Sequence, residues 1–178
     1  MSNKRTVFWT EWFSVEQVPG AGEASLNGEP YYRVNSPDGV IVLAMTRDER
    51  IILVRQFRPA VNQYTLEFPS GAVNESESPQ AAAMRELQEE AGFVCESMEL
   101  LGCGRIMMNR HNCQEYAFYG TGAVKAPGCT EEEGMEVVLL SVLDFKKLVL
   151  SGGFEQFPAF APIVLAAWKS GNRAFLEV

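Results

Sequence analysis

The sequence predicts one α/β domain, and three observations lead to this class. Strand-like runs rich in β-branched and aromatic residues dominate the first 71 residues, a capped helix follows at residues 78–92, and two helical segments close the chain. With 178 residues, 47% of them hydrophobic and 21% charged, the chain can bury one core of ordinary globular composition. We expect residues 39–178 to form the main domain and residues 1–38 to supply N-terminal strands.

Most of the predicted elements are strands. In chain order they are residues 6–16, 31–35, 40–46, 51–57, 64–71, 98–104, 114–120 and 136–141. The segments 40–46 and 51–57 are apolar enough to be buried on both faces, so we expect them to form a hairpin at the centre of the sheet. Pro69 and Gly71 are expected to end the strand that begins at residue 64.

Helix boundaries are indicated by capping residues. Ser78 can accept hydrogen bonds from free backbone amides and Pro79 suits the first helical position, so a helix is expected to start there. Gly92 is the matching stop. Two further helices are expected at residues 142–153 and 161–171, each ending at glycine.

Charge and cysteine content exclude several classes of protein. The net charge of -8 argues against a nucleic acid or an anionic membrane as partner, because both bind basic surfaces. The four cysteines have no C-x-x-C spacing and His111 is the only histidine, so we expect free thiols and no structural zinc site. No stretch resembles a signal sequence or a membrane span, and we expect a soluble, cytoplasmic protein.

The predicted helix at residues 78–92 carries three glutamates close together. Glu86, Glu89 and Glu90 fall within an arc of about 100° around the helix axis, beside an apolar arc. They lie in the last turns, where the helix dipole disfavours carboxylates, and lysines are missing from the i+4 positions. A solvated surface would tolerate such a cluster, but a divalent cation compensates it better. Mg²⁺ prefers carboxylate, carbonyl, water and phosphate oxygens.

The helix belongs to a longer motif. Residues 71–93, GAVNESESPQAAAMRELQEEAGF, match every position of the Nudix box, G-x5-E-x7-R-E-U-x-E-E-x-G-U, where U is a bulky aliphatic or aromatic residue. The preceding residues 43–73, LAMTRDERIILVRQFRPAVNQYTLEFPSGAV, resemble the same stretch of ADP-ribose pyrophosphatases and related nucleoside-diphosphate-sugar hydrolases. The resemblance implies a mixed-sheet α/β/α sandwich that hydrolyses a nucleoside diphosphate linked to another moiety, with Mg²⁺ or Mn²⁺.

The resemblance also assigns roles to residues of the box. It implies that Glu86 and Glu90 are the principal metal ligands, that the backbone carbonyl of Ser70 is another, and that Glu89 is either a further ligand or an acid that supports the ligands without touching the metal. Arg85 would orient these acids by ion pairing, with Glu67 or Glu77 as its further partner. Bound metal ions would stabilise charge on the phosphates and lower the pKa of a bound water, so an acidic protein could act on an anionic substrate.

Further site residues are expected outside the box. Related enzymes present an arginine to the substrate phosphates where Arg58 lies, although a surface arginine before a proline turn is an equal alternative. A glutamate before a late strand acts as general base in related enzymes, and Glu133, followed by Glu131, is the candidate here; an exposed charge run would look the same. Asn109 and Arg110 are candidates for contacts with a sugar or phosphate.

Three functions remain open from the sequence. The first is Mg²⁺-dependent hydrolysis of ADP-ribose or a related nucleoside diphosphate sugar. The alternatives are hydrolysis of dinucleotide polyphosphates or nucleoside triphosphates, and nucleotide sensing without catalysis. Related enzymes are commonly homodimers with exchanged N-terminal strands, so we expect a homodimer. Trp9, Trp12 and Phe13 are expected to pack in the core, with base stacking or a dimer seam as alternatives.

Overall fold

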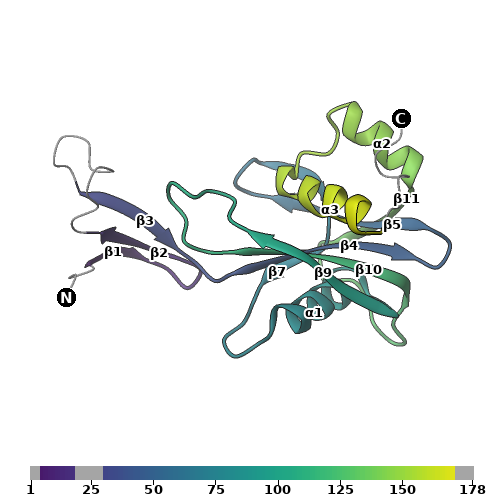
Figure 1. Cartoon of the computed structure of the whole chain (residues 1–178), viewed down its shortest axis with the longest axis horizontal. Coiled ribbons are helices and arrows are strands. Elements are labelled where there is room, and N and C mark those ends of the chain that lie inside the picture. Colours follow the sequence, from purple (N-terminus) through teal and green to yellow (C-terminus); the bar gives the residue numbers. More distant parts are fainter. Residues whose placement is uncertain (1–4, 19–29, 171–178) are drawn as a thin grey trace.

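The computed structural model describes residues 5–18 and 30–170 of the chain. Two sheets and the helices around the larger one make up this part of the molecule (Figure 1). In chain order its elements are β1 (Arg5–Trp9), β2 (Ser14–Val18), β3 (Tyr31–Asn35), β4 (Gly39–Thr46), β5 (Arg50–Arg58), β6 (Gln63–Glu67), β7 (Ser70–Ala72), α1 (Pro79–Ala91), β8 (Phe93–Val94), β9 (Ser97–Gly104), β10 (Glu115–Lys125), β11 (Glu136–Ser141), α2 (Val142–Leu150), the short 3-10 helix η3 (Phe157–Ala159) and α3 (Phe160–Ser170).

The N-terminal strands form a separate antiparallel sheet in the order β1-β2-β3, which extends to one side of the main body (Figure 1). The single strand expected at residues 6–16 is wrong, because a turn divides it. The Thr10 hydroxyl accepts hydrogen bonds from the backbone amides of Trp12 and Phe13, at 3.1 and 3.0 Å, and closes this turn. Core packing of the tryptophans is also wrong, since Trp9 is 70% and Trp12 is 78% exposed. Gly20, Gly22 and Gly28, which the sequence places between the predicted strands 6–16 and 31–35, lie outside the described residues.

The larger sheet is mixed. Its strands run in the order β11-β5-β4-β10, with β6 on β5, β7 on β4, and β8 and β9 on β10. Strand β10 is parallel to β4, and the other pairs of the sheet are antiparallel. Strands β4 and β5 have one paired position, Met45 with Ile51. Beyond it the two strands separate, and β7 pairs with β4 while β6 pairs with β5. The expected strand at residues 64–71 is therefore two strands, interrupted at Phe68 and Pro69.

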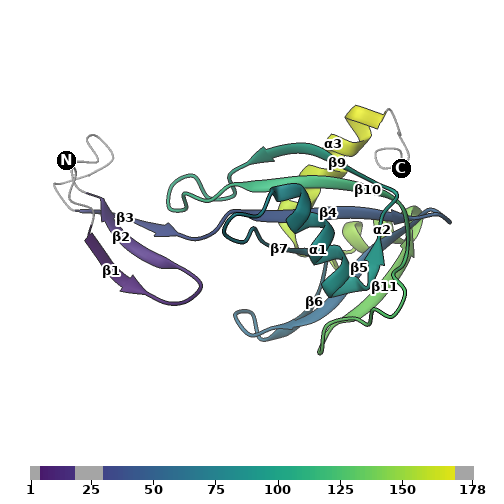
Figure 2. The same cartoon turned by 90° about the horizontal axis from the view of Figure 1, so that it is seen from below.

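Helices cover both faces of this sheet (Figures 1 and 2). On one face, Val40 and Val42 of β4 pack with Ala83 and Leu87 of α1. On the other, Ile41 and further alternate residues of β4 pack with α2 and α3. Central strands buried on both faces follow from this arrangement, and the predicted α/β/α sandwich is confirmed.

The helix that carries the box begins and ends as its capping residues predict. The Ser78 hydroxyl accepts a hydrogen bond from the Ala81 amide, and Pro79 is the first helical residue. Gly92 adopts a left-handed φ of 68° and its amide bonds the carbonyl of Gln88 at 2.9 Å.

The remaining elements differ from expectation mainly at their ends. Strand β10 continues to Lys125 beyond the predicted end, and the short β8 was not predicted. Helices α2 and α3 occupy the two expected segments, although α2 stops at Leu150, and Gly171, the expected end of α3, lies outside the described residues. The four cysteines have free thiols, as expected. None of the helices described is long and apolar enough to cross a membrane.

Candidate active site

The three glutamates of α1 are buried to very different degrees. Glu90 is 5% exposed, and the side chains of Glu86 and Glu89 are 12% and 55% exposed. The acidic arc is therefore not a solvated surface, because its inner members lie between α1 and the sheet. Burying carboxylates in this way is costly unless cations or hydrogen bonds compensate them.

Glu90 is the least compensated of these acids. Its carboxylate accepts one hydrogen bond from the Ser70 amide, at 2.9 Å. Burial, aided by the charge of Glu86, raises the pKa of Glu90 to about 8, although the Ser70 amide and Arg58 oppose the rise. Among the residues the structure describes, Glu90 has no ion pair. A carboxyl group held in this state is a candidate for binding a cation.

Glu86 lies directly against the backbone of β7. A Cβ atom at Gly71 would lie 2.1 Å from the carboxyl carbon of Glu86, so the glycine allows the close approach of the side chain. Burial raises the pKa of Glu86, while the hydrogen bond and charge of Arg85 lower it. Gly71, the first residue of the box, and Glu86, its second glutamate, are therefore in close contact although they lie far apart in the motif.

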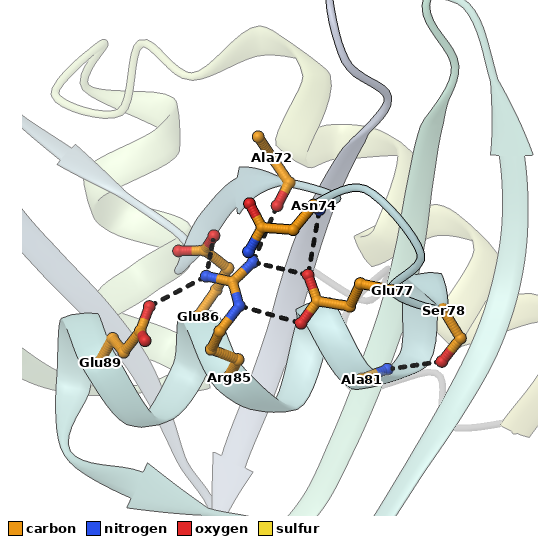
Figure 3. A network of polar contacts seen from close by, with 8 residues as sticks. All are labelled: Ala72, Asn74, Glu77, Ser78, Ala81, Arg85, Glu86 and Glu89. Carbon is orange, nitrogen blue, oxygen red and sulfur yellow. Dashed lines mark hydrogen bonds and ion pairs between the residues drawn. The ribbon is translucent and has the colours of Figure 1, made fainter.

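Arg85 holds the acids of the box in place (Figure 3). Its guanidinium group donates two hydrogen bonds to Glu77, both at 3.0 Å, and further bonds to Glu86 at 2.7 Å and to Glu89 at 2.9 Å. It also bonds the carbonyl of Ala72 at 2.8 Å. These partners raise the pKa of Arg85, with Glu77 contributing most.

A second arginine, Arg58, pairs with Glu67 across the hairpin formed by β5 and β6. Arg58 donates two hydrogen bonds to Glu67, at 2.8 and 2.7 Å, and the Thr65 hydroxyl donates a third at 2.6 Å. Burial pushes the pKa of Glu67 upward, but these hydrogen bonds outweigh it and lower the pKa below its usual value. Of the two partners expected for Arg85, the structure has Glu77, because Glu67 faces Arg58.

The loop before β11 approaches α1 through a different glutamate from the expected one. The Glu132 amide donates a hydrogen bond to the carbonyl of Glu89 at 3.1 Å, and the charge of Glu132 contributes to the raised pKa of Glu86. Glu131 pairs with Lys125, and Glu133 is exposed. The role of Glu133 as general base stays a prediction.

Asn109 and Arg110 lie in the loop between β9 and β10, which the structure joins to β3. The Val34 amide bonds the Arg110 carbonyl at 2.8 Å, and the Tyr31 hydroxyl bonds the Asn109 carbonyl. The Arg110 guanidinium lies over the Tyr31 ring, 4.6 Å from its centroid. The two residues are therefore held against strand β3 of the N-terminal sheet. Their contact with a substrate stays a prediction.

Sequence reasoning missed two glutamines at the site. Gln56 is buried on β5 two residues before Arg58, and its amide nitrogen has no acceptor among the described residues. Gln156 accepts a hydrogen bond from the Phe68 amide at 2.8 Å and donates one to the Ser70 hydroxyl at 3.4 Å. Neither residue belongs to the box, so only the fold reveals its position.

The charge balance of the site suits a divalent cation. Five carboxylates gather here and two guanidinium groups neutralise part of their charge; the acids are Glu67, Glu77, Glu86, Glu89 and Glu90. Within residues 5–18 and 30–170, no three acidic, thiol or imidazole side chains already converge on one ion position. Mg²⁺ keeps several waters and shares substrate phosphates, so it needs only one or two of these carboxylates. The donor set fits such an ion.

Known proteins resemble the chain in both structure and sequence. A crystal structure of an ADP compounds hydrolase aligns over 95% of this chain and 92% of its own, with a TM-score of 0.75 and 22% identity, which shows the same fold. A methanol dehydrogenase activator of Bacillus methanolicus is 39% identical over 77 residues. An ADP-sugar pyrophosphatase of Mus musculus is 47% identical over 68 residues, and an ADP-ribose pyrophosphatase of Bacillus subtilis is 38% identical over 65 residues.

These sequence matches are partial. They cover 42%, 36% and 36% of this chain and 42%, 31% and 35% of the respective relatives, so less than half of each relative is matched. The NUDIX domain family matches residues 35–158, which include the larger sheet from β4 onward and the whole acidic site. The chain belongs to the Nudix family.

Proposed function

We propose that the protein is a Mg²⁺- or Mn²⁺-dependent pyrophosphohydrolase of ADP-ribose or a related nucleoside diphosphate sugar. The products are a nucleoside monophosphate and a sugar phosphate. The observation that carries the proposal is the buried, unpaired carboxylate of Glu90 within a cluster of further acids. The names of the pyrophosphatases from mouse and Bacillus subtilis support the substrate class.

Each residue of the site has a part in this proposal. Glu86, Glu89, Glu90 and the Ser70 carbonyl hold the metal, which supplies charge stabilisation to the phosphates and an activated water. Arg85 keeps Glu86 and Glu89 oriented through its fork of hydrogen bonds. A glutamate of the loop before β11, Glu133 in the first instance, accepts a proton from the attacking water.

Arg58 is proposed to contact the substrate phosphates. Its side chain is 43% exposed, so one side of the guanidinium group remains accessible while the other is fixed by Glu67. A guanidinium group held in this way can bind a phosphate with little loss of conformational entropy. Because Arg58 is both held by Glu67 and accessible to solvent, we favour phosphate binding over the alternative that it is an ordinary surface residue.

The test is chromatographic analysis of the reaction products across a panel of substrates. The panel contains ADP-ribose, ADP-glucose, GDP-mannose, a diadenosine polyphosphate and nucleoside triphosphates, each with Mg²⁺ and with EDTA. We expect Mg²⁺-dependent cleavage of a diphosphate sugar, lost in Glu90→Gln and kept in the matched control Glu136→Gln, an exposed acid on β11. Preferred cleavage of a polyphosphate would select that substrate class instead. An inert panel with nucleotide-dependent thermal stabilisation would indicate a sensor and refute the proposal.

We also propose that the protein is a homodimer joined through the N-terminal sheet. Phe8, Trp9 and Trp12 are 53%, 70% and 78% exposed in the single chain, and aromatic surfaces of this kind favour association. Sedimentation velocity at micromolar concentration is expected to give the mass of two chains. A double substitution, Trp9→Ser with Trp12→Ser, is expected to give one chain, and a monomeric wild type would contradict the proposal.

A further inference from the structure

A pocket of about 540 Å³ lies on the sheet face opposite α1. Its walls come from the ends of β9 and β10, from Ile41 of β4, and from η3 and the start of α3. Volumes of 300–1,000 Å³ are typical of small-molecule sites. None of the residues assigned to the metal and phosphate site lines this pocket, so it requires its own explanation.

Glycine keeps the β9 wall of the pocket open. A Cβ atom at Gly104 would meet no other atom within 4 Å, and one at Gly102 would lie 3.4 Å from the Leu165 side chain. The register places these glycines beside Glu115 and Ala117 of β10. The floor is therefore flat backbone with one large side chain, that of Glu115, and a planar molecule can lie against it.

Glu115 is an acid in mostly apolar surroundings. Its carboxylate lies over Gly39, where a Cβ atom would be 2.4 Å from its oxygen. Burial raises the pKa of Glu115 to about 7, and the charge of Asp38 adds to the rise. In the described part of the chain its carboxylate has no hydrogen bond or ion pair. Arg105, also in the pocket wall, instead donates to the carbonyls of Asn112 and Cys113.

Aromatic rings complete the pocket on the helical side. Phe157 of η3 is 81% exposed and meets Phe160 edge to face, with ring centroids 5.5 Å apart. An exposed ring beside an apolar cavity is suited to stacking on another planar ring, such as a nucleobase.

The pocket adjoins the metal and phosphate site through Ser70. Ile41, which lines the pocket, is the register partner of Ser70, whose amide bonds Glu90. Gln156 bonds the Ser70 hydroxyl and is followed directly by Phe157 of the pocket wall. Ser70 therefore lies between the two sites, and a second group on a diphosphate held at the glutamates would pass Ser70 to enter the pocket.

We propose that this pocket binds the nucleobase of the substrate, stacked on Phe157 with an N–H edge turned toward Glu115. The inference rests on the proposed function, since it assigns the base of the same substrate. Carboxylate oxygens accept hydrogen bonds from amino and ring N–H groups, which bases offer and phosphates lack. Apolar walls favour a base over a sugar, whose many hydroxyls would lose their hydrogen bonds there.

The first experiment measures binding without metal. Amide chemical shifts of the ¹⁵N-labelled protein are recorded in EDTA during titration with AMP, GMP and ribose 5-phosphate. We expect the nucleotides to shift the amides of Gly102 and Gly104, and ribose 5-phosphate to leave them unchanged. Unmoved amides, or equal shifts with ribose 5-phosphate, would overturn the proposal. If the amide shifts of Gly102 and Gly104 changed with protein concentration and not with nucleotide, a second copy of the chain would cover the pocket. That result would also overturn the proposal.

Two variants test the roles of the residues. Glu115→Gln keeps the size of the side chain, and we expect it to weaken nucleotide binding about tenfold, the loss of one charge-assisted hydrogen bond. Gly104→Val suits a strand and fills the open space, and we expect it to abolish the shifts. The matched control is Glu99→Gln, an exposed acid on β9, which should bind as the wild type does. Wild-type affinity in both pocket variants would refute the assignment.

Kinetics separate this proposal from the proposed function. If the protein hydrolyses a diphosphate sugar, Glu115→Gln should raise KM about tenfold and change kcat less than about twofold, because the base is remote from the reacting phosphorus. An unchanged KM would refute the pocket assignment and leave the hydrolase intact. Base-dependent binding in EDTA without any hydrolysis would refute the hydrolase and leave the pocket standing.

Discussion

Replacing Glu90 by glutamine is expected to stabilise the metal-free protein while abolishing its hydrolysis. Folding raises the pKa of Glu90 from 4.5 to about 8. The folded protein therefore binds more protons than the unfolded chain between these values, so its stability falls as pH rises from about 4.5 and levels off above about 8. At pH 7 the folded protein must keep this carboxyl largely protonated, which costs about 3 kcal/mol relative to the unfolded chain, from about 1.4 kcal/mol per pKa unit.

Glutamine removes this cost and keeps a weaker acceptor for the Ser70 amide. The weaker hydrogen bond costs about 1 kcal/mol, which leaves a net gain of about 2 kcal/mol at pH 7. For a chain of this length the gain corresponds to about 4–8 °C in Tm. At pH 5, close to the unfolded pKa, the cost of keeping the carboxyl protonated falls to about 1 kcal/mol, which is about the cost of the weaker hydrogen bond, so the gain should vanish.

Urea unfolding in EDTA at pH 5 and pH 7 measures both values. Glu89→Gln is the matched control, because the Glu89 side chain is 55% exposed and its removal should change stability by about 0.5 kcal/mol or less. Hydrolysis with Mg²⁺ should fall at least about a hundredfold in Glu90→Gln, since the metal contributes several kcal/mol of charge stabilisation. A destabilised Glu90→Gln, or an equal gain at both pH values, would refute the reasoning.

Three further outcomes follow from the site. Mg²⁺ at a hundredfold excess over Kd should add about 2.7 kcal/mol to wild-type stability and much less to that of Glu90→Gln. Equal Tm shifts of the two proteins in thermal melts would contradict metal binding by Glu90. Gly71→Ala would place a methyl 2.1 Å from the Glu86 carboxyl carbon and should cost about 1–3 kcal/mol and tenfold in kcat, whereas wild-type urea and kinetic values would disprove the close packing. Arg58→Lys should raise KM about tenfold, because lysine lacks the two-pronged hydrogen bond to Glu67, while Arg55→Lys should not; equal kinetics in the two variants would argue against phosphate binding.

Features determined by local interactions were predictable from the sequence. The start of α1 at Ser78 and Pro79 and its stop at Gly92 depend on backbone groups within one helical turn, and the structure has them as expected. The turn at Thr10 was missed because it contains neither glycine nor proline, and a side-chain hydroxyl closes it instead. Local composition gave no signal of that turn.

Relationships between distant residues were less predictable. The partner of Arg58 depends on the register of β5 and β6, which places Thr65 and Glu67 on the face of Arg58. Periodicity identifies a strand but does not fix its register. Glu115 carries no motif at all, and only the packing of β10 beside Gly39 and under α3 reveals that its carboxylate is buried.

Gln156 gives the C-terminal part of the chain a direct influence on the box. Through one side chain, it joins the segment before α3 to Phe68 and Ser70, where the chain leads through β7 toward the glutamates of α1. Substitutions near residue 156 can therefore shift Ser70 while every residue of the box stays the same. If the two proposals hold, substrate choice and hydrolytic chemistry could change separately during divergence, one in the C-terminal segment and the other in the glutamate helix.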